Sequence, residues 1–446
     1  MLEPLKNPTY RHLFAAQVIA LLGTGLTTVA LALLSYDLAG DKAGTVLGTA
    51  LALKMLAYVT IAPIVGGLAT ALPRKKVLVT LDLIRAGFVL CLPFVSEIWQ
   101  IYLIIFLMQS CSAGFTPMFQ ATIPDIIPDE KTYTKALSLS RLAYDLESLI
   151  SPMLAAVALL FLSSDALFAS NAVAFLISAA LVVTATLPKR DRAKDARVIS
   201  VWEKISFGTR AYLSTPRLRG LLALSLAVSA AGAMVIVNTV VIVRGGFGLG
   251  EQDVALAFAA YGSGSMLAAF TLPKLLDYLP DRPVMLGGAN ILAIGLLAGS
   301  TVSSFFWLLP VWFLLGSAAS LINTPTGRLL RRSSAEQDRP AYFAAQFSLS
   351  HACWLITYPL VGFFGAFIGI TATFYILTGI VMLGFILALF LWPADDQASL
   401  IHTHKNFDPN DPHIADAKAV KGGYQHKHDF VIDHYHRAWP FRSGVE

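Results

Sequence analysis

The sequence predicts an all-α integral membrane protein whose twelve transmembrane helices form two pseudo-symmetric six-helix bundles. Of its 446 residues, 56% are hydrophobic and only 14% are charged, and the mean hydropathy is +0.65. A soluble domain carries about 25% charged residues, so this composition indicates a membrane protein. A membrane helix needs about 20 mostly apolar residues. The predicted spans are 13–35, 44–72, 77–96, 99–121, 136–162, 165–187, 218–243, 252–276, 284–303, 305–327, 341–363 and 370–392.

Basic residues gather in the loops on one side of this predicted membrane. With a cytoplasmic N-terminus, the inner loops hold PRKK (73–76), KRDRAK (189–194) and RLLRRSSAEQDR (328–339), and the outer loops hold only Lys42 and Arg244. Lys and Arg are enriched in cytoplasmic loops, so we expect both termini in the cytoplasm, with the protein in a bacterial inner membrane. The net charge of +5 therefore reflects topology, and no nucleic-acid partner is expected.

An internal repeat predicts that the two halves are equivalent. GGLATALPRKKVL (66–78) follows span 2, and PKLLDYLPDRPVM (273–285) follows span 8, with Leu, Leu, Pro and Val in matching positions. A second match, SLSRLAY with SLSHACW, opens spans 5 and 11 and aligns Arg141 with His351. Parallel six-helix repeats around a central cavity are typical of transporters that work by alternating access.

Other features of the sequence exclude common classes of enzyme. It contains no ATP-binding Gly-x-x-x-x-Gly-Lys loop and no Gly-x-Ser-x-Gly turn, so we expect no catalysis and an ion gradient as the source of energy. Cys91, Cys111 and Cys353 lie in apolar runs without a CxxC pattern, which argues against zinc or disulfide sites. We expect a monomer in the lipid bilayer, with a small ion or molecule as substrate and no resident cofactor. The expected parts are an N-terminal bundle (1–187), a cytoplasmic linker (188–217), a C-terminal bundle (218–392) and a cytoplasmic His-rich tail (393–446).

The basic loop after span 2 resembles that of the major facilitator superfamily. Members usually carry Gly-x-x-x-Asp-Arg-x-Gly-Arg-Arg there. In this chain Thr70 and Ala71 stand in place of the Asp and Arg, residues 74–76 keep the basic end, and the second-half copy has an acid, Asp277. The resemblance covers residues 7–392 and implies the major facilitator fold.

Two further segments narrow the resemblance. Residues 116–154 are similar to the exporter branch that includes macrolide, siderophore and nickel efflux proteins. The tail, with its spaced His-x-His pairs ending in HDFVIDHYHRAWP, resembles the nickel-resistance efflux proteins of the superfamily. These resemblances imply an exporter.

The tail holds seven of the nine histidines. The seven are His402, His404, His413, His426, His428, His434 and His436. Six of them form three His-x-His pairs, and in an extended chain residues i and i+2 point to the same side, so that one pair can hold one ion. Neutral imidazole is a suitable ligand for Ni, Zn, Cu and Co, and the lack of Cys and Met in the tail argues against Cu(I). We predict a metal-binding tail that captures ions or reports their level. The alternatives are a pH-sensing tail and a disordered tail with chance histidines.

Ionisable residues inside the predicted spans are costly, and this marks them as functional. Asp82 and Arg85, three apart on span 3, share a helix face and can pair. Together with Arg141 and Asp277 they are the predicted gating residues.

A second group of charges is predicted to couple transport to protons. Arg141 and Asp145 can also pair, but Glu147 lies about 200° around the helix from Asp145 and cannot join them. It is free to pair with Lys54, a lysine deep in span 2, or to act alone. A deep carboxylate can bind a proton and a divalent cation in turn, so we predict coupling through Lys54, Asp145, Glu147 and His351. The alternatives are ion pairing between helices and, for His351, helix packing.

The leading prediction is a proton-coupled exporter of divalent metal, with nickel first and cobalt second. One alternative is the same scaffold exporting a drug-like or siderophore-like organic compound. Another is a metal sensor or receptor that uses a transporter fold without moving a substrate.

Overall fold

The computed structural model describes residues 3–68, 73–187, 201–276, 278–335 and 338–397, and in the tail 399–404, 412–414, 416–421, 423–433, 436 and 439–440. The first half contains η1 (Glu3–Lys6), α1 (Pro8–Ala39), η2 (Gly40–Lys42), α2 (Ala43–Leu68), α3 (Arg74–Cys91), η3 (Leu92–Phe94), α4 (Ile98–Ile126), α5 (Glu130–Leu159) and α6 (Ser164–Thr184). Next come α7 (Val201–Ser214), α8 (Pro216–Val240) with the π turn η4 (Val241–Gly246), α9 (Glu251–Leu275), α10 (Asp281–Gly299), α11 (Phe305–Arg332), α12 (Arg339–Phe367) and α13 (Ile370–Leu391). The tail contains β1 (Ser399–His404), η6 (Pro412–Ile414), β2 (Lys418–Val420) and β3 (Gly423–Asp429).

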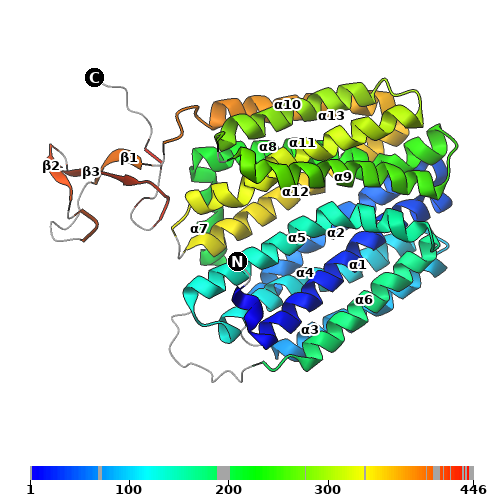
Figure 1. Ribbon diagram of the computed structural model, residues 1–446, viewed down its shortest axis with the longest axis horizontal. Helices are drawn as coiled ribbons and strands as arrows, with labels where there is room; N and C mark the ends of the chain where they lie inside the picture. The colour runs from blue at the N-terminus through cyan, green and yellow to red at the C-terminus, as the bar shows by residue number, and fades with distance from the viewer. Residues whose placement is uncertain are drawn as a thin grey trace.

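The long helices of the described ranges match the twelve predicted spans one for one and fall into two halves. Helices α1 to α6 form one bundle and α8 to α13 form the other, side by side in Figure 1. Side-chain caps fix several helix starts, because the first N–H groups of a helix have no partner within it. Asn7 caps α1, Asp129 caps α5 and Ser163 caps α6. The twelve-helix fold predicted from the sequence is confirmed.

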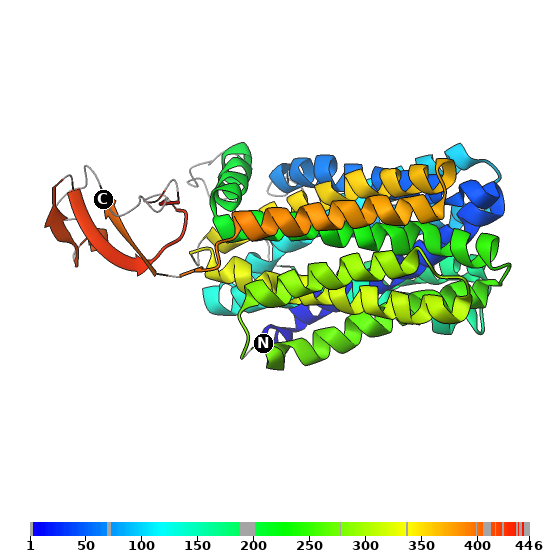
Figure 2. The same cartoon turned by 90° about the horizontal axis from the view of Figure 1, so that it is seen from above.

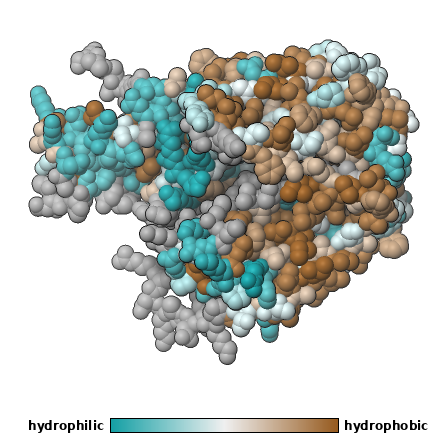
Figure 3. All heavy atoms as spheres, in the orientation of Figure 1, coloured by the Kyte–Doolittle hydropathy of each residue, from teal (hydrophilic) through white to brown (hydrophobic). Residues whose placement is uncertain are grey.

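The outer surface of the bundle suits a bilayer. Ten segments of the described residues are long and apolar enough to cross a membrane, and the first of them, Pro8–Ile61, includes α1 and most of α2. Figure 3 shows apolar residues over the helices, whereas polar residues gather over the tail and the adjoining end of the bundle. Large apolar side chains such as Phe390 and Phe161 are more than 80% exposed, as expected of helices that face lipid rather than water.

The two bundles meet through α2 against α12 and α5 against α9. At one end α2 and α12 cross at glycines: a Cβ on Gly362 would lie 2.2 Å from the carbonyl oxygen of Gly44, so no larger residue fits without a backbone shift. Beside this crossing, the Thr45 hydroxyl donates to the Gly362 carbonyl (3.0 Å) and Arg244 pairs with Asp37 (2.6 Å). These residues lie at the end of the bundle where the sequence predicts the outer loops, so that end holds the two halves together.

Two elements were not predicted from the sequence. Helix α7 lies within the stretch predicted to be a linker and packs on α12, where Tyr212 donates a hydrogen bond to Gln346. The tail forms an antiparallel three-stranded sheet in the order β1–β3–β2, and in Figure 2 it projects beyond the helix ends on the same side as α7. The sheet carries most of the tail histidines.

Candidate metal centre and candidate transport site

Strand pairing brings four histidines onto one face of the tail sheet. In the β1–β3 register His402 lies opposite His426, and Leu400 lies opposite His428. Because successive side chains of a strand point to opposite faces, His402 and His404 on β1 share the face that carries His426 and His428 on β3. The two His-x-His pairs therefore meet in space although they are separated by more than twenty residues.

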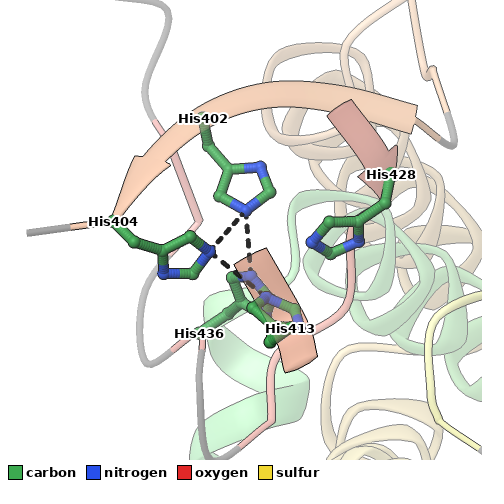
Figure 4. A group of neighbouring side chains, drawn as sticks. All are labelled: His402, His404, His413, His428 and His436. Atoms are coloured by element: carbon green, nitrogen blue, oxygen red, sulfur yellow. Dashed lines mark hydrogen bonds between the residues drawn. The ribbon is translucent and has the colours of Figure 1, made fainter. Parts of the chain in front are cut away.

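Two further histidines close over this face. His413 comes from the short helix η6, and His436 follows β3. The donor nitrogens of five rings, those of His402, His404, His413, His428 and His436, all lie within 4.8 Å of one another. Figure 4 shows these rings converging from different segments of the tail. The sixth ring belongs to His426, whose Nε2 is 3.1 Å from the Nε2 of His404. His434 lies outside the described residues.

The outward-facing nitrogen of four of these rings is held by an oxygen. Nδ1 of His402 lies 3.2 Å from the Leu400 carbonyl, and Nδ1 of His428 lies 2.8 Å from the Asp429 carbonyl. Nδ1 of His426 faces a carboxylate oxygen of Asp416 (3.2 Å), and Nδ1 of His436 faces one of Asp433 (2.9 Å). A hydrogen on Nδ1 leaves the Nε2 lone pair free, and this arrangement orients histidine ligands in metal sites.

Four rings of the cluster have a lowered pKa, which favours their uncharged form near neutral pH. Burial and the neighbouring imidazoles lower the pKa of His402 and His404 from 6.5 to about 4. Burial also lowers the pKa of His413 and His428. Neutral imidazoles are the form that binds metal. The Nε2 of His428 is buried without a hydrogen-bond partner, and such groups are rare unless something else satisfies them.

The tail docks on the C-terminal bundle beside this cluster. The Tyr342 hydroxyl of α12 donates to the Ile432 carbonyl (2.8 Å), and the guanidinium of Arg217 on α8 lies 5.1 Å from the centre of the Trp439 ring. Phe430, buried to 3% exposure, joins the two regions, since its ring contacts those of His402, His436 and Trp439. An ion held by the histidines would therefore also fix the segment that contacts the bundle.

The predicted coupling residues Lys54 and Glu147 lie near the middle of α2 and α5. Each remains partly exposed, so each faces space within the bundle. The two charges are close enough to interact, although within the described residues no direct ion pair joins them. Glu147 lies beside the crossing of α1 and α5, where a Cβ on Gly25 would be 3.2 Å from its carboxylate oxygen. Tyr358 of α12, in the other half, is close enough to feel the charge of Glu147.

His351 has aromatic neighbours from both halves. Its ring centroid is 5.6 Å from that of Tyr58 on α2 and 3.9 Å from that of Phe347 on its own helix, α12. Its Nδ1 contacts the Phe347 carbonyl (2.6 Å). His351 thus lies at the junction of the halves.

The predicted gating pair Asp82 and Arg85 lies inside one half. Asp82 pairs with Arg85 and accepts a hydrogen bond from Ser178 of α6 (2.7 Å). The Arg85 guanidinium lies between the rings of Phe115 and Phe175, at 4.6 and 4.4 Å. This network ties α3 to α4 and α6 within the first bundle. The side chains of Arg141 and Asp145, and residue Asp277, lie outside the described residues.

Several ion pairs at the helix ends were not found from the sequence. Arg244 pairs with Asp37 at one end of the bundle. At the other end Arg328 pairs with Asp281, and Arg217 pairs with Asp396 (3.1 Å). Their partners are distant along the chain and follow no short motif, so only the fold reveals them.

The comparison with protein families gives a match over nearly the whole chain. The model of the Major Facilitator Superfamily matches residues 13–250 and again residues 222–413. The chain is 26% identical over 349 residues to an uncharacterized MFS-type transporter, YfiS, of Bacillus subtilis, covering 72% of this chain and 79% of that protein. It is 26% identical over 182 residues to macrolide efflux protein A of Streptococcus pyogenes, covering 40% of this chain and 44% of that protein.

Solved structures with little sequence identity share the fold. A mutant of the nucleoside transporter NupG superposes with a TM-score of 0.66 at 12% identity, covering 86% of this chain and all of that chain. A bacterial homologue of the human lysosomal transporter Spinster, in an inward-facing and unoccupied conformation, gives 0.65 at 13% identity, covering 86% and 96%.

Proposed function

The chain belongs to the Major Facilitator Superfamily, and from that premise we propose that it exports divalent metal cations, nickel first and cobalt second, in exchange for protons. The observation that carries this proposal is the cluster of tail histidines, whose donor nitrogens converge within 4.8 Å of one another. We place the protein in a bacterial inner membrane with both termini in the cytoplasm, which puts the tail where exported metal is taken up.

The deep pair of charges supports proton coupling. Glu147 is a carboxylate with partial access from within the bundle, and its nearest described counter-charge is Lys54. A divalent cation that binds Glu147 must overcome repulsion from the nearby ammonium group of Lys54, and a proton on Glu147 removes the charge that attracts the cation. Because one carboxylate cannot hold both at once, the competition couples outward metal movement to inward proton movement. Tyr358 of the other half lies near Glu147, which suits a site at the junction that alternating access requires.

A second candidate is export of an organic compound. It is favoured by relatives named macrolide efflux protein A, from Streptococcus pyogenes and Enterococcus faecalis. The aromatic groups at the junction of α2 and α12 also suit an apolar substrate, since Tyr58 and Phe347 have ring centroids 5.9 Å apart and Trp354 and Tyr358 4.9 Å apart.

Cell-associated metal separates the two candidates. Cells that express the wild type or Glu147→Gln are loaded with a mixture of Ni, Co, Zn, Fe and Mn, and their metal content is measured by mass spectrometry. We expect nickel and cobalt to fall with the wild type and to stay at the level of empty-vector cells with the variant. Glu251→Gln, at the start of α9, serves as the matched control and should export like the wild type. If no metal falls while macrolide tolerance rises, the organic candidate replaces the metal one.

A further inference from the structure

The six histidine rings of the tail are arranged as the corners of an octahedron. Six rings form fifteen pairs, and twelve of these pairs have ring centroids between 4.6 and 5.1 Å apart. Within the described tail the other three pairs have no ring contact with each other: His402 with His413, His404 with His428, and His426 with His436. No histidine occurs in two of these three pairs. Twelve nearly equal edges and three separate diagonals define an octahedron and no tetrahedral arrangement.

Four nitrogen distances, among His402, His404, His413, His426 and His436, are compatible with the same geometry. On four of the twelve edges the two Nε2 atoms are 3.0, 3.1, 3.2 and 3.0 Å apart. A divalent metal bonds to imidazole nitrogen at about 2.0–2.1 Å, so neighbouring ligands are about 3.0 Å apart in an octahedron and about 3.3–3.4 Å apart in a tetrahedron. The observed edges fit the octahedron better, with a centre that one ion would fill.

A cation between the rings would account for these close nitrogen contacts. Nδ1 of both His402 and His436 faces an oxygen, so each ring carries its hydrogen there and presents a lone pair at Nε2. Their two Nε2 atoms nevertheless lie 3.0 Å apart. Two lone pairs at that distance repel each other, and a shared metal ion turns the repulsion into two bonds.

We infer that the tail folds around one six-coordinate metal ion, held by the Nε2 atoms of His402, His404, His413, His426, His428 and His436, and that it prefers nickel and cobalt to zinc. This inference rests on the metal-binding role that the proposed function gives the tail. Zinc is almost always four-coordinate in structural sites. Copper(II) prefers tetragonal geometry, whereas the twelve ring-centroid edges here all lie between 4.6 and 5.1 Å. Nickel(II) and cobalt(II) accept six equivalent nitrogen donors.

A six-coordinate site has a consequence for what the tail does. All six positions are taken by protein, as in closed structural sites, and none is left for exchange with water or a second site. The same segment docks on the bundle: Trp439 packs on Arg217 of α8, and the Ile432 carbonyl accepts a hydrogen bond from Tyr342 of α12. The tail therefore reports metal by folding and docking rather than passing ions into the transport path.

Cobalt spectroscopy on the purified full-length protein tests the site directly. Octahedral Co²⁺ absorbs weakly in the visible range and tetrahedral Co²⁺ absorbs many times more strongly. We expect one Co²⁺ per chain with weak bands, and displacement by Ni²⁺ at a lower concentration than by Zn²⁺. Intense bands, two or more ions per chain, tighter Zn²⁺ binding, or no bound metal would each overturn the inference.

Matched variants keep the test independent of folding failure. His426→Gln removes one corner, and the tail should then bind Co²⁺ at least tenfold more weakly. Asp416→Asn leaves all six rings in place but weakens the acceptor of the His426 Nδ1 hydrogen; such outer partners typically change affinity by roughly 10- to 100-fold. His12→Gln, on α1 outside the tail, should bind Co²⁺ like the wild type. Equal binding by His426→Gln and the wild type contradicts six-coordination.

The cobalt-binding test and the cellular export test can contradict the two proposals independently. If cells lose nickel but the purified protein binds no metal at the tail, the six-histidine site is wrong and the exporter stands. If the tail binds one octahedral ion but no metal leaves the cells, the site stands and the exporter is wrong.

Discussion

Trp439→Ala should release the tail from the bundle without disturbing the helices. The Trp439 ring stacks on the Arg217 guanidinium (5.1 Å) and meets the Phe430 ring edge to face at a centroid distance of 5.1 Å. A cation–π contact of this kind contributes about 1 kcal/mol, and an aromatic pair contributes about 1 kcal/mol beyond its buried area. Losing both costs about 2 kcal/mol, which shifts the docking equilibrium roughly 30-fold.

Hydrogen–deuterium exchange on the full-length protein in detergent measures this shift. Amides of β3 should exchange up to about 30-fold faster in Trp439→Ala, while those of α8 and α12 keep their wild-type rates. Trp307→Ala, an exposed tryptophan on α11, is the matched control and should leave β3 unchanged. If β3 in Trp439→Ala exchanges at the wild-type rate, Trp439 does not hold the tail in place and our account of docking is refuted.

Three further predictions concern metal, pH and the closed end of the bundle. Nickel at about 100 times its dissociation constant should stabilise the folded tail by about 2.7 kcal/mol, seen as slower β3 exchange that a chelator reverses; no slowing contradicts metal-dependent folding. In metal-free protein, the contribution of His402 and His404 to the stability of the folded tail should be complete above pH 6.5 and be lost as the pH falls toward 4. The reason is that their pKa is lowered to about 4 in the folded tail, so the unfolded tail takes up protons first. The β3 exchange rate, corrected for intrinsic rates, should rise over that range, and a flat profile would count against burial of these rings. Arg244→Ala removes the ion pair to Asp37 between the halves, and this pair contributes up to about 1 kcal/mol. An impermeant maleimide should therefore label a cysteine placed at Thr45 up to about fivefold faster. Unchanged labelling would mean that the ion pair does not hold this end of the bundle closed.

The membrane fold is predictable from this sequence because each span is a local signal. An apolar run of about 20 residues becomes a helix in lipid, since unpaired backbone groups are too costly there. Helix α7 gives no such signal: Val201–Ser214 is short and carries charged residues among its apolar ones. It forms because Tyr212 and neighbouring residues pack on α12.

The histidine cluster can be predicted only in part from the sequence. The spacing of His402 with His404, and of His426 with His428, shows that each pair can share a face. The meeting of the pairs depends on the β1–β3 register, and the polar, irregular tail sequence does not specify that register locally. His413 carries no pair signal at all and joins through η6. The convergence of all six rings is thus a property of the fold.

The arrangement of the charges within the bundle is likewise only partly predictable from the sequence. The spacing of Asp82 and Arg85 predicts their pairing, and the structure pairs them. Spacing does not reveal that the pair lies inside one bundle among Phe115, Phe175 and Ser178. For Lys54 and Glu147, on different helices, only packing brings the charges near each other.

Flux through purified protein in liposomes tests the central claim most directly. Nickel uptake and internal pH are followed together after a proton gradient is imposed across vesicles that contain the wild type or Glu147→Gln. We expect nickel to move against the proton flow in wild-type vesicles and a nickel gradient alone to drive protons the other way, whereas the variant should do neither. Nickel that does not move, or that moves without protons, would contradict this claim.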